Sequence, residues 1–173
     1  MKKDRIHDRD RHKGRVLERF HTILLFILFA AVVFVLFRFV IGIARISGDS
    51  MYPALEDGDL VVYGRIIRTY EPGDIVSVRV PAGKYYVKRV IACGGDTVDI
   101  RDGSVFVNGK QIEDDWAFGM TEEETGAVVY PYTVRPGAVF VLGDNREVSM
   151  DSRAFGEVGT RQIRGKVIWH EEI

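Results

Sequence analysis

The strongest constraint on this chain is an apolar run from Phe20 to Ala44, FHTILLFILFAAVVFVLFRFVIGIA, broken only by His21 and Arg38. About 20 mostly apolar residues let a helix cross the hydrocarbon core of a bilayer. The run therefore predicts one transmembrane helix over 20–44. A cleaved leader is the alternative interpretation, but its apolar part would be about 7 to 15 residues long and would end at a small-x-small site.

The charge differs between the two sides of this run. Residues 1–19 carry eight Lys or Arg and four acids, whereas residues 45–173 carry 15 Lys or Arg and 21 acids. Basic residues that flank a span remain in the cytoplasm. We expect a cytoplasmic basic tail over 1–19, a single pass through the cell membrane with lipid as a partner, and an extracytoplasmic domain over 45–173. The acid excess of that domain argues against nucleic-acid binding.

The part after the span is predicted to be mostly β. Short β-branched and aromatic runs alternate with Pro-Gly, Gly-Gly-Asp, Asp-Gly and Asn-Gly turn signals. The expected strands cover 58–67, 73–80, 84–93, 97–100, 105–112, 137–144 and 165–173. Asn108-Gly109 is the strongest hairpin signal, because a type I′ turn needs positive φ at both central residues. The fold class is therefore a transmembrane helix followed by a compact, largely antiparallel β domain.

An acidic stretch, EDDWAFGMTEEETGA at 113–127, interrupts the strand pattern. We expect an exposed loop or insertion over 113–136, because a segment this polar has little to bury.

Histidine chemistry and metal chemistry have few residues available in the predicted domain. Three of the four histidines precede or begin the span, and His170 lies at the end of the last predicted strand. A Ser-His-Asp triad is therefore not expected. One cysteine and one histidine cannot make a zinc ligand set, so we expect no metal and no cofactor. The single Cys93 forms no internal disulfide, and strand alternation turns it away from the face of Lys88.

A lysine can replace histidine as a base if burial lowers its pKa, by up to about 3 to 5 units. Lys88 is embedded in the apolar strand YYVKRVIAC, whereas the other lysines of the domain border turns or strand ends. Period-two alternation places Lys88 on one face with Tyr86, Val90 and Ala92, and Arg89 on the other. The alternative interpretation is an edge strand whose charge discourages aggregation.

The block SGDSMYPALEDGD at 47–59 offers a hydroxyl nucleophile, Ser50. Met51 and Leu55 are apolar in a loop that should be polar, as if they lined a pocket, and Gly48 allows another backbone to approach closely. A plain turn or capping role for the serine is the alternative.

A third polar block, GDNREVSMDSRAFG at 143–156, follows a predicted strand. Its acids could fix Arg89 and Arg153, and Ser149 could hydrogen-bond an amine and so orient it. The alternative is a solvated loop held by local hydrogen bonds.

Taken together, these blocks resemble the bacterial type I signal peptidases, in their small Gram-positive-like form. The matching blocks are 47–59, YYVKRVIACGGD at 85–96 and 143–156, with PGDIVSVRV at 72–80 between the first two and the span upstream. The resemblance runs from 46 to 156 in matching order. It is the combination and order of blocks beside an anchor that is specific.

The resemblance implies a membrane-anchored serine endopeptidase that removes signal peptides from exported preproteins after small-x-small sites, near the secretion translocase. Ser50 would be the nucleophile and neutral Lys88 the general base. The Ser50 backbone N–H would meet the oxyanion, and Gly48 stands where some relatives add a hydroxyl. The sequence also departs from the family at Ala54 and Val148, where threonine and asparagine are commoner.

Further site residues are implied in the same way. Ser149 would orient the lysine, and an ionic frame behind the site would consist of Asp144, Arg89, Asp151 and Arg153. A shallow substrate pocket would be lined by Met51, Leu55, Tyr86 and Val87. A substrate in extended form would add to a strand edge beside Lys88.

Two other functions fit parts of the sequence. The self-cleaving repressors of the bacterial DNA-damage response also use a Ser-Lys dyad, but they are cytoplasmic and carry a DNA-binding domain. A membrane-tethered β module that binds a partner without catalysis is the other. Cleavage of a second chain would distinguish a signal peptidase from both.

Overall fold

The computed structural model describes residues 2–80, 83–124 and 128–171. The chain divides into two compact units between Val40 and Ile41. The first unit is helical. Helix α1 (Lys2–Val35) continues into a π-helical turn, η1 (Leu36–Val40). Within it, Arg19–Val40 is long and apolar enough to cross a membrane, with a mean hydropathy of 3.0.

The helix ends four residues before the predicted limit of the span at Ala44. Residues from Ile41 on form strand β1 (Ile41–Arg45), which pairs with β2 (Leu60–Gly64). Gly42 lies against the ring of Tyr63, where a Cβ would come within 2.2 Å of a ring carbon. Hydropathy cannot separate these residues from the helix, because an apolar strand and an apolar helix are equally hydrophobic.

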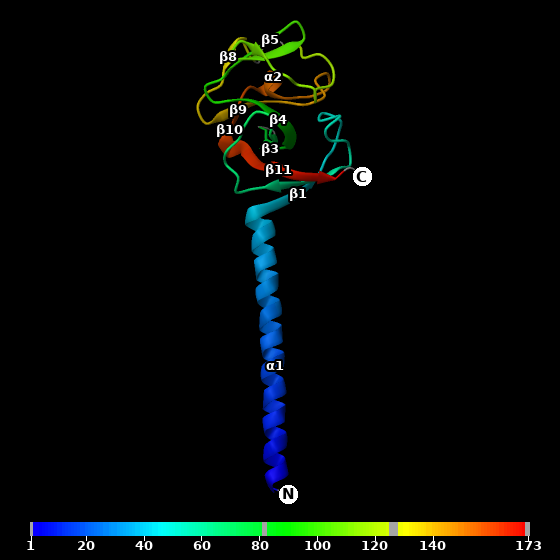
Figure 1. Cartoon of the computed structure of the whole chain (residues 1–173), viewed down its shortest axis with the longest axis vertical. Helices are drawn as coiled ribbons and strands as arrows, with labels where there is room; N and C mark the ends of the chain where they lie inside the picture. Colours follow the sequence, from blue (N-terminus) through cyan, green and yellow to red (C-terminus); the bar gives the residue numbers. More distant parts are fainter. Residues whose placement is uncertain (1, 81–82, 125–127, 172–173) are drawn as a thin grey trace. The chain divides into compact units, whose positions relative to one another are not determined.

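The second unit contains two antiparallel sheets (Figure 1). Within the described residues the larger has seven strands in the order β1-β2-β11-β3-β4-β9-β10, and the smaller has four in the order β7-β6-β5-β8. The remaining strands of the larger sheet are β3 (Ile75–Arg79), β4 (Tyr85–Cys93), β9 (Ala138–Leu142), β10 (Val158–Gly159) and β11 (Ile163–Glu171). The smaller sheet contains β5 (Thr97–Arg101), β6 (Ser104–Val107), β7 (Lys110–Gln111) and β8 (Tyr132–Thr133). Two short helical segments, α2 (Ser152–Phe155) and η2 (Thr160–Gln162), lie near the chain's end. The predicted fold class is confirmed.

Strand β9 separates two parts of the hydrophobic core. Its five residues are all buried. Phe140 and Leu142 pack with residues of the smaller sheet, whereas Val139 and Val141 pack with β3 and with Val90 of β4. The period-two alternation of side chains explains this division. A third cluster, under β2, contains Met51 and Leu55 from the serine-bearing loop.

The predicted hairpin at Asn108-Gly109 is confirmed. Strands β6 and β7 pair with Val107 opposite Lys110, and both turn residues have positive φ, 53° and 77°. These are the angles that a type I′ turn requires.

The segment 113–136 is more than the exposed loop that its composition predicts; of the acidic stretch, residues 125–127 lie outside the described residues. Thr121, Val128 and Val134 are buried, and β8 lies within the segment. Phe118 forms a parallel bridge to Asn145, which ties the acidic stretch to the block that follows β9. Tertiary contacts, which composition does not reveal, account for the difference.

Strand β4 lies between β3 and β9 in the larger sheet. It pairs with β3 along residues 85–89 and with β9 only over residues 89–93, so Lys88 has a strand partner on the β3 side alone. Lys88 is nevertheless 2% exposed, so the interpretation of its charge as an exposed guard on an edge strand is wrong. The pairing with β9 shifts register between Val90 and Ala92, and Ala92 packs in a different core cluster from Val90. The predicted alternation holds as far as Val90 and is wrong for Ala92 and for Cys93, which packs in the cluster of Val90.

Candidate active site

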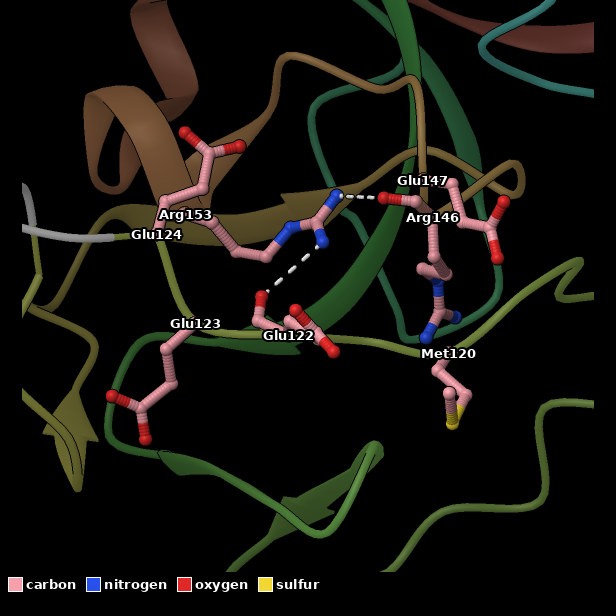
Figure 2. Close-up of a pocket in the computed structure, with 7 residues that line it drawn as sticks. All are labelled: Met120, Glu122, Glu123, Glu124, Arg146, Glu147 and Arg153. Carbon is pink, nitrogen blue, oxygen red and sulfur yellow. Dashed lines mark hydrogen bonds between the residues drawn. The ribbon is translucent and has the colours of Figure 1, made fainter.

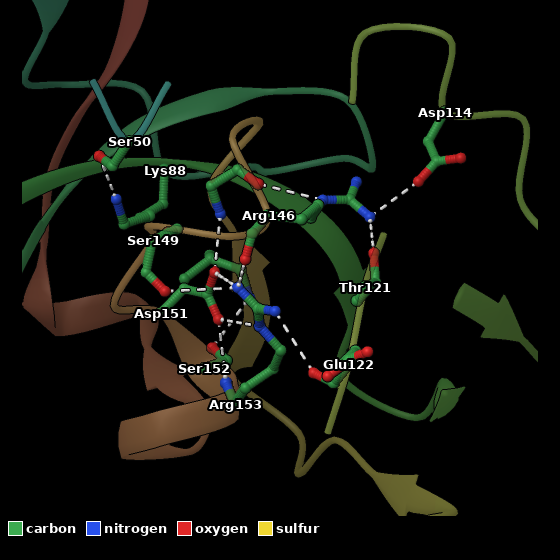
Figure 3. Close-up of polar contacts among 12 residues, drawn as sticks. Ser50, Lys88, Asp114, Thr121, Glu122, Arg146, Ser149, Asp151, Ser152 and Arg153 are labelled. Carbon is green, nitrogen blue, oxygen red and sulfur yellow. Dashed lines mark hydrogen bonds and ion pairs between the residues drawn. The ribbon is translucent and has the colours of Figure 1, made fainter. Parts of the chain in front are cut away.

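Lys88 and Ser50 meet at the centre of the candidate site. The Lys88 Nζ lies 2.6 Å from the Ser50 Oγ (Figure 3). Lys88 is 2% exposed and its ammonium position lies 5.6 Å from the centroid of the Tyr86 ring. The sequence predicted this pair from two blocks that are 38 residues apart.

Burial lowers the pKa of Lys88 from 10.5 to about 8. The negative charges of Asp151 and Asp144 oppose this change by favouring the ammonium form. Desolvation is the larger effect, because an ammonium loses its hydration when it enters the interior. A useful fraction of Lys88 is therefore neutral near pH 8, and its lone pair can accept the Ser50 proton.

The loop that carries Ser50 is fixed by its apolar residues. Met51 is 1% exposed and Leu55 0%, and both pack in the core under β2. The Leu55 N–H donates to the Met51 carbonyl at 3.0 Å, and the Asn145 N–H donates to the Ser50 carbonyl at 3.2 Å. These contacts hold the backbone on both sides of the hydroxyl. Burial of Met51 leaves the neighbouring Ser50 half-buried at the surface of the core.

Gly48 adopts φ of 86°, a conformation that side chains rarely occupy. Its N–H donates to the Asp57 Oδ1 at 2.8 Å. A hydroxyl residue would be strained at this position, so the backbone itself disfavours a side-chain donor there. Among the described residues, no acceptor takes the N–H of Ser50, which leaves that group available to an incoming oxygen.

Two buried ion pairs stand behind the dyad, as the sequence predicted. Arg89 binds both carboxylate oxygens of Asp144, with Nε 2.8 Å and Nη2 2.5 Å away. Arg153 binds both oxygens of Asp151 at 2.9 Å. Asp151 also accepts the Gly143 N–H at 3.0 Å. Burial raises the pKa of Asp144, and the hydrogen bonds from Arg89 act against this rise.

Ser149 lies in this frame, and its carbonyl accepts a hydrogen bond from the Arg153 Nη2 at 3.3 Å. The residue is 5% exposed, but its hydroxyl finds no hydrogen-bond partner among the described residues. Gly143 packs directly against it: a Cβ on Gly143 would lie 2.1 Å from the Ser149 Oγ and 2.4 Å from the Ser50 carbonyl oxygen. Only glycine fits between the two serine-bearing segments.

Sequence reasoning missed Arg146 and the residues that hold it. Arg146 is 2% exposed; it donates to the Gly143 carbonyl and to Thr121, and it pairs with Asp114 at 2.8 Å (Figure 3). Arg146 and Thr121 are 25 residues apart, and Thr121 lies in a stretch read as an acidic loop. No local motif links them. The one sequence signal was the apolar triplet Trp-Ala-Phe at 116–118 within the acidic stretch. Apolar residues in such a segment indicate that it packs against the rest of the domain.

A pocket of about 160 Å³ opens beside Ser50. Its lining residues are Ala44, Arg45, Ile46, Ser47, Ser50, Met51, Ser77, Tyr85, Tyr86, Val87 and Arg164. Met51, Tyr86 and Val87 were predicted here. Leu55 does not line the pocket, because it is fully buried beneath the loop. A pocket of this size accommodates small side chains.

A separate pocket of about 380 Å³ borders the ionic frame at Arg153 (Figure 2). Glutamates line it, together with Met120, Arg146 and Arg153. Arg153 there donates to the carbonyls of Glu122 and Arg146. Neither dyad residue reaches it. Among the described residues, no group of His, Cys, Asp and Glu could hold a metal ion.

A buried lysine beside a serine hydroxyl on a β scaffold defines a class: serine hydrolases that could use an amine base. Comparison with known proteins identifies the family. The model of the family "Signal peptidase, peptidase S26" matches residues 19–170. The chain therefore belongs to this family, and it is a serine endopeptidase of the signal peptidase type.

Relatives and a solved structure agree with this assignment. Signal peptidase IB of Staphylococcus aureus is 33% identical over 153 residues, which cover 79% of this chain and 80% of the relative. Signal peptidase I of Bacillus caldolyticus is 36% identical over 142 residues, 70% of this chain and 74% of the relative. The crystal structure of a signal peptidase I from Enterococcus faecalis matches with a TM-score of 0.51 and 31% identity, over 58% of this chain and 97% of that one.

Proposed function

We propose that this protein is a membrane-anchored endopeptidase that removes N-terminal signal peptides from exported preproteins after small-x-small sites, with Ser50 as nucleophile and neutral Lys88 as general base. The observation that carries the proposal is the contact of 2.6 Å between the Lys88 Nζ, buried and with its pKa lowered to about 8, and the Ser50 Oγ. A charged lysine could not take the serine proton.

The reaction would proceed in two halves. Lys88 takes the hydroxyl proton as the Ser50 Oγ attacks the scissile carbonyl, and the Ser50 N–H stabilises the oxyanion. The C–N bond then breaks, the ammonium of Lys88 returns the proton to the leaving amine, and the signal peptide remains as an ester on Ser50. In the second half, Lys88 takes a proton from water, whose oxygen attacks the ester and frees the serine.

The surrounding residues have supporting roles in this proposal. The Ser149 Oγ makes no hydrogen bond among the described residues, and in this proposal it turns toward the Lys88 amine to orient it. Asp144 with Arg89 and Asp151 with Arg153 keep the frame rigid. Asp144 and Asp151 also moderate the cost of burying the lysine, since their charges favour its ammonium form.

The substrate would bind as an added strand. Residues 85–88 of β4 pair with β3 on one side, and the pairing with β9 begins only at Arg89. The opposite edge of this half-strand is therefore available for main-chain hydrogen bonds to an extended peptide. Small residues before the cut fit the pocket beside Ser50.

The location follows from the same proposal. The apolar helix Arg19–Val40 anchors the enzyme in the cell membrane, with the basic tail in the cytoplasm and the β domain outside. Membrane lipid is then a partner, and enzyme and substrate share one plane, close to the secretion translocase, which raises their effective concentration.

The test is cleavage of a purified preprotein in nonionic detergent. Ser50→Ala and Lys88→Ala should each reduce processing by at least about a thousandfold, as removal of a nucleophile or its base does elsewhere. Ser104→Ala and Lys110→Ala, in the smaller sheet, are matched controls that should process at the wild-type rate. Normal processing by either dyad variant would refute the mechanism, and cleavage only in cis would favour the repressor-like alternative.

A further inference from the structure

One of the residues around the pocket beside Ser50 is an arginine on an irregular part of β11. In the pairing of β11 with β3, Ile163 lies opposite Val78 and Gly165 opposite Ser77, so Arg164 is one extra residue between them. A bulge of this kind redirects the side chain of the extra residue and is often found next to active sites. Arg164 lines the pocket that contains Ser50.

Two aromatic rings hold the Arg164 guanidinium in place. Its central carbon lies 4.7 Å from the centroid of Tyr85 and 5.4 Å from that of Tyr63. Tyr63 is 1% exposed, so it provides a fixed surface. Among the described residues no carboxylate pairs with Arg164 and no acceptor takes its N–H groups. A guanidinium over ring faces keeps the donors at its edge for a ligand.

The charge of this pocket is opposite to that of its domain. Residues 45–173 carry 21 acids and 15 Lys or Arg. The residues that line the pocket include two arginines, Arg45 and Arg164, and no acid. The Arg45 side chain is fixed by a hydrogen bond to the Gly58 carbonyl at 3.0 Å. The lining of the substrate pocket is therefore positively charged, whereas the domain carries an excess of acids.

The distance from Arg164 to the dyad can be counted along β4, because Arg164 lies over the ring of Tyr85. Tyr85 precedes Lys88 by three residues on β4, which corresponds to about 10 Å of strand. An extended substrate beside β4 spans this distance with about three residues. A side chain that meets Arg164 then belongs to a residue about three to five positions before the cut, and the third position is reserved for a small residue.

We propose that Arg164 is a specificity-determining residue that favours preproteins with a carboxylate side chain at the fourth or fifth position before the cleavage site and disfavours lysine there. Planar bidentate pairing suits a guanidinium and a carboxylate. A substrate lysine would instead be repelled by Arg164 as a like charge, and Arg45 adds to the positive charge of the pocket. This inference rests on the proposed function, because it places the residues before the cut in the pocket beside Ser50.

The test uses the full-length enzyme in uncharged detergent and a preprotein with Glu, Gln or Lys at the fourth position, and separately at the fifth. For the wild type, kcat/KM should be roughly fivefold higher with Glu than with Lys, the scale of one exposed charge pair. Arg164→Gln should bring this ratio close to one, and Arg164→Glu should reverse it. Arg65→Gln is the matched control. The Arg65 guanidinium also lies over the Tyr63 ring, 5.2 Å from its centroid, but Arg65 does not line the pocket. The Glu-to-Lys ratio of the Arg65→Gln variant should therefore stay at the wild-type value.

Equal Glu-to-Lys ratios of kcat/KM for wild type and Arg164→Gln would overturn the inference. A preference that appears only in vesicles with anionic lipid would also overturn it, because Arg164 would then bind lipid headgroups and not the substrate. Binding of the same peptides by Ser50→Ala and by Ser50→Ala with Arg164→Gln gives the ratio without cleavage. A wild type that binds Glu peptides better but cleaves none would contradict the proposed function and leave the charge preference confirmed.

Discussion

Two Ser-Met pairs meet across Gly143 and are placed in opposite ways. In the first, Met51 is 1% exposed and the Ser50 Oγ lies 2.6 Å from Lys88. In the second, Met150 is 58% exposed, and Ser149 is buried with no hydrogen-bond partner for its Oγ among the described residues. The same dipeptide thus directs its hydroxyl toward the pocket in one loop and into the frame in the other.

The packing around each pair explains the difference. In the first loop, Met51 and Leu55 are taken into the core, so the backbone presents Ser50 to the pocket and to a substrate carbonyl. In the second, Asp151 accepts the Gly143 N–H and pairs with Arg153, and this contact turns the chain so that Ser149 lies inside. A nucleophile needs access, whereas a residue that orients a base needs a fixed, dry place. The dipeptide alone encodes neither.

Gly143→Ala is expected to give the largest effect on this comparison, because a Cβ there would lie 2.1 Å from the Ser149 Oγ and 2.4 Å from the Ser50 carbonyl oxygen. Both loops must then move apart. Displacement by about 1 Å can cost a hundredfold in rate, so processing should fall at least that much. Gly159→Ala is the control, since its Cβ would meet only the Gln162 Oε1, at 3.3 Å, and its φ of −63° is ordinary. Wild-type processing by Gly143→Ala would mean that the two loops do not share a fixed spacing.

The pH dependence of processing should come next in size. The pKa of Lys88 is about 8, and only the neutral amine accepts the serine proton, so kcat/KM should fall about tenfold per pH unit well below pH 8. The measurement is kcat/KM from pH 6 to 9.5 in detergent, with circular dichroism to verify that the fold persists. A profile that stays flat down to pH 6 would exclude Lys88 as the base.

How much of this could be predicted from the sequence depends on the range of the contacts. The apolar span, the Asn108-Gly109 hairpin and the antiparallel strands follow from local periodicity and turn chemistry, so they were predictable. The Ser50 and Lys88 pair came from an embedded lysine and a family pattern. Local rules cannot reveal the bulge after Val90, or Arg146 bound by a distant threonine. These features depend on which segments pack together, and Leu55 was misplaced for the same reason.

Ser149→Ala tests whether the two serines have different roles, and its expected effect on processing is smaller. If Ser149 orients Lys88, its loss should lower kcat/KM by roughly tenfold and shift the apparent pKa of the pH profile, because positioning groups alter the base that they hold. A purely structural role would leave that pKa where it is. The alanine variant should be no less stable than wild type, since an unpartnered buried hydroxyl costs about 1 to 3 kcal/mol. An unchanged rate and pKa together would remove Ser149 from the mechanism.

The smallest expected effect is on the free energy of unfolding. It measures how much the burial of Lys88 beside Ser50 destabilises the folded protein. The pKa of Lys88 is 10.5 when exposed and about 8 in the folded protein, so between these pH values the unfolded chain binds a proton that the native one does not. Stability therefore rises with pH across this window, and below pH 8 the native state carries the cost of a buried ammonium, on the order of 3 kcal/mol at most.

Lys88→Met keeps the length of the side chain and removes the charge, so at pH 7 it should raise the free energy of unfolding by roughly 1 to 3 kcal/mol while abolishing activity. The gain should shrink as pH approaches 10.5, where the folded wild-type amine is neutral and the unfolded one is already half deprotonated. Denaturant titrations of both proteins in the same detergent at pH 7 and pH 10.5 measure it, with Lys110→Met, on the exposed strand β7, as the variant that should show no pH-dependent difference. A stabilisation by Lys88→Met that does not vary with pH would mean that removal of the buried ammonium is not its cause. A loss of stability at pH 7 would mean that the contact of Lys88 with Ser50 stabilises the fold by more than the desolvation of Lys88 destabilises it.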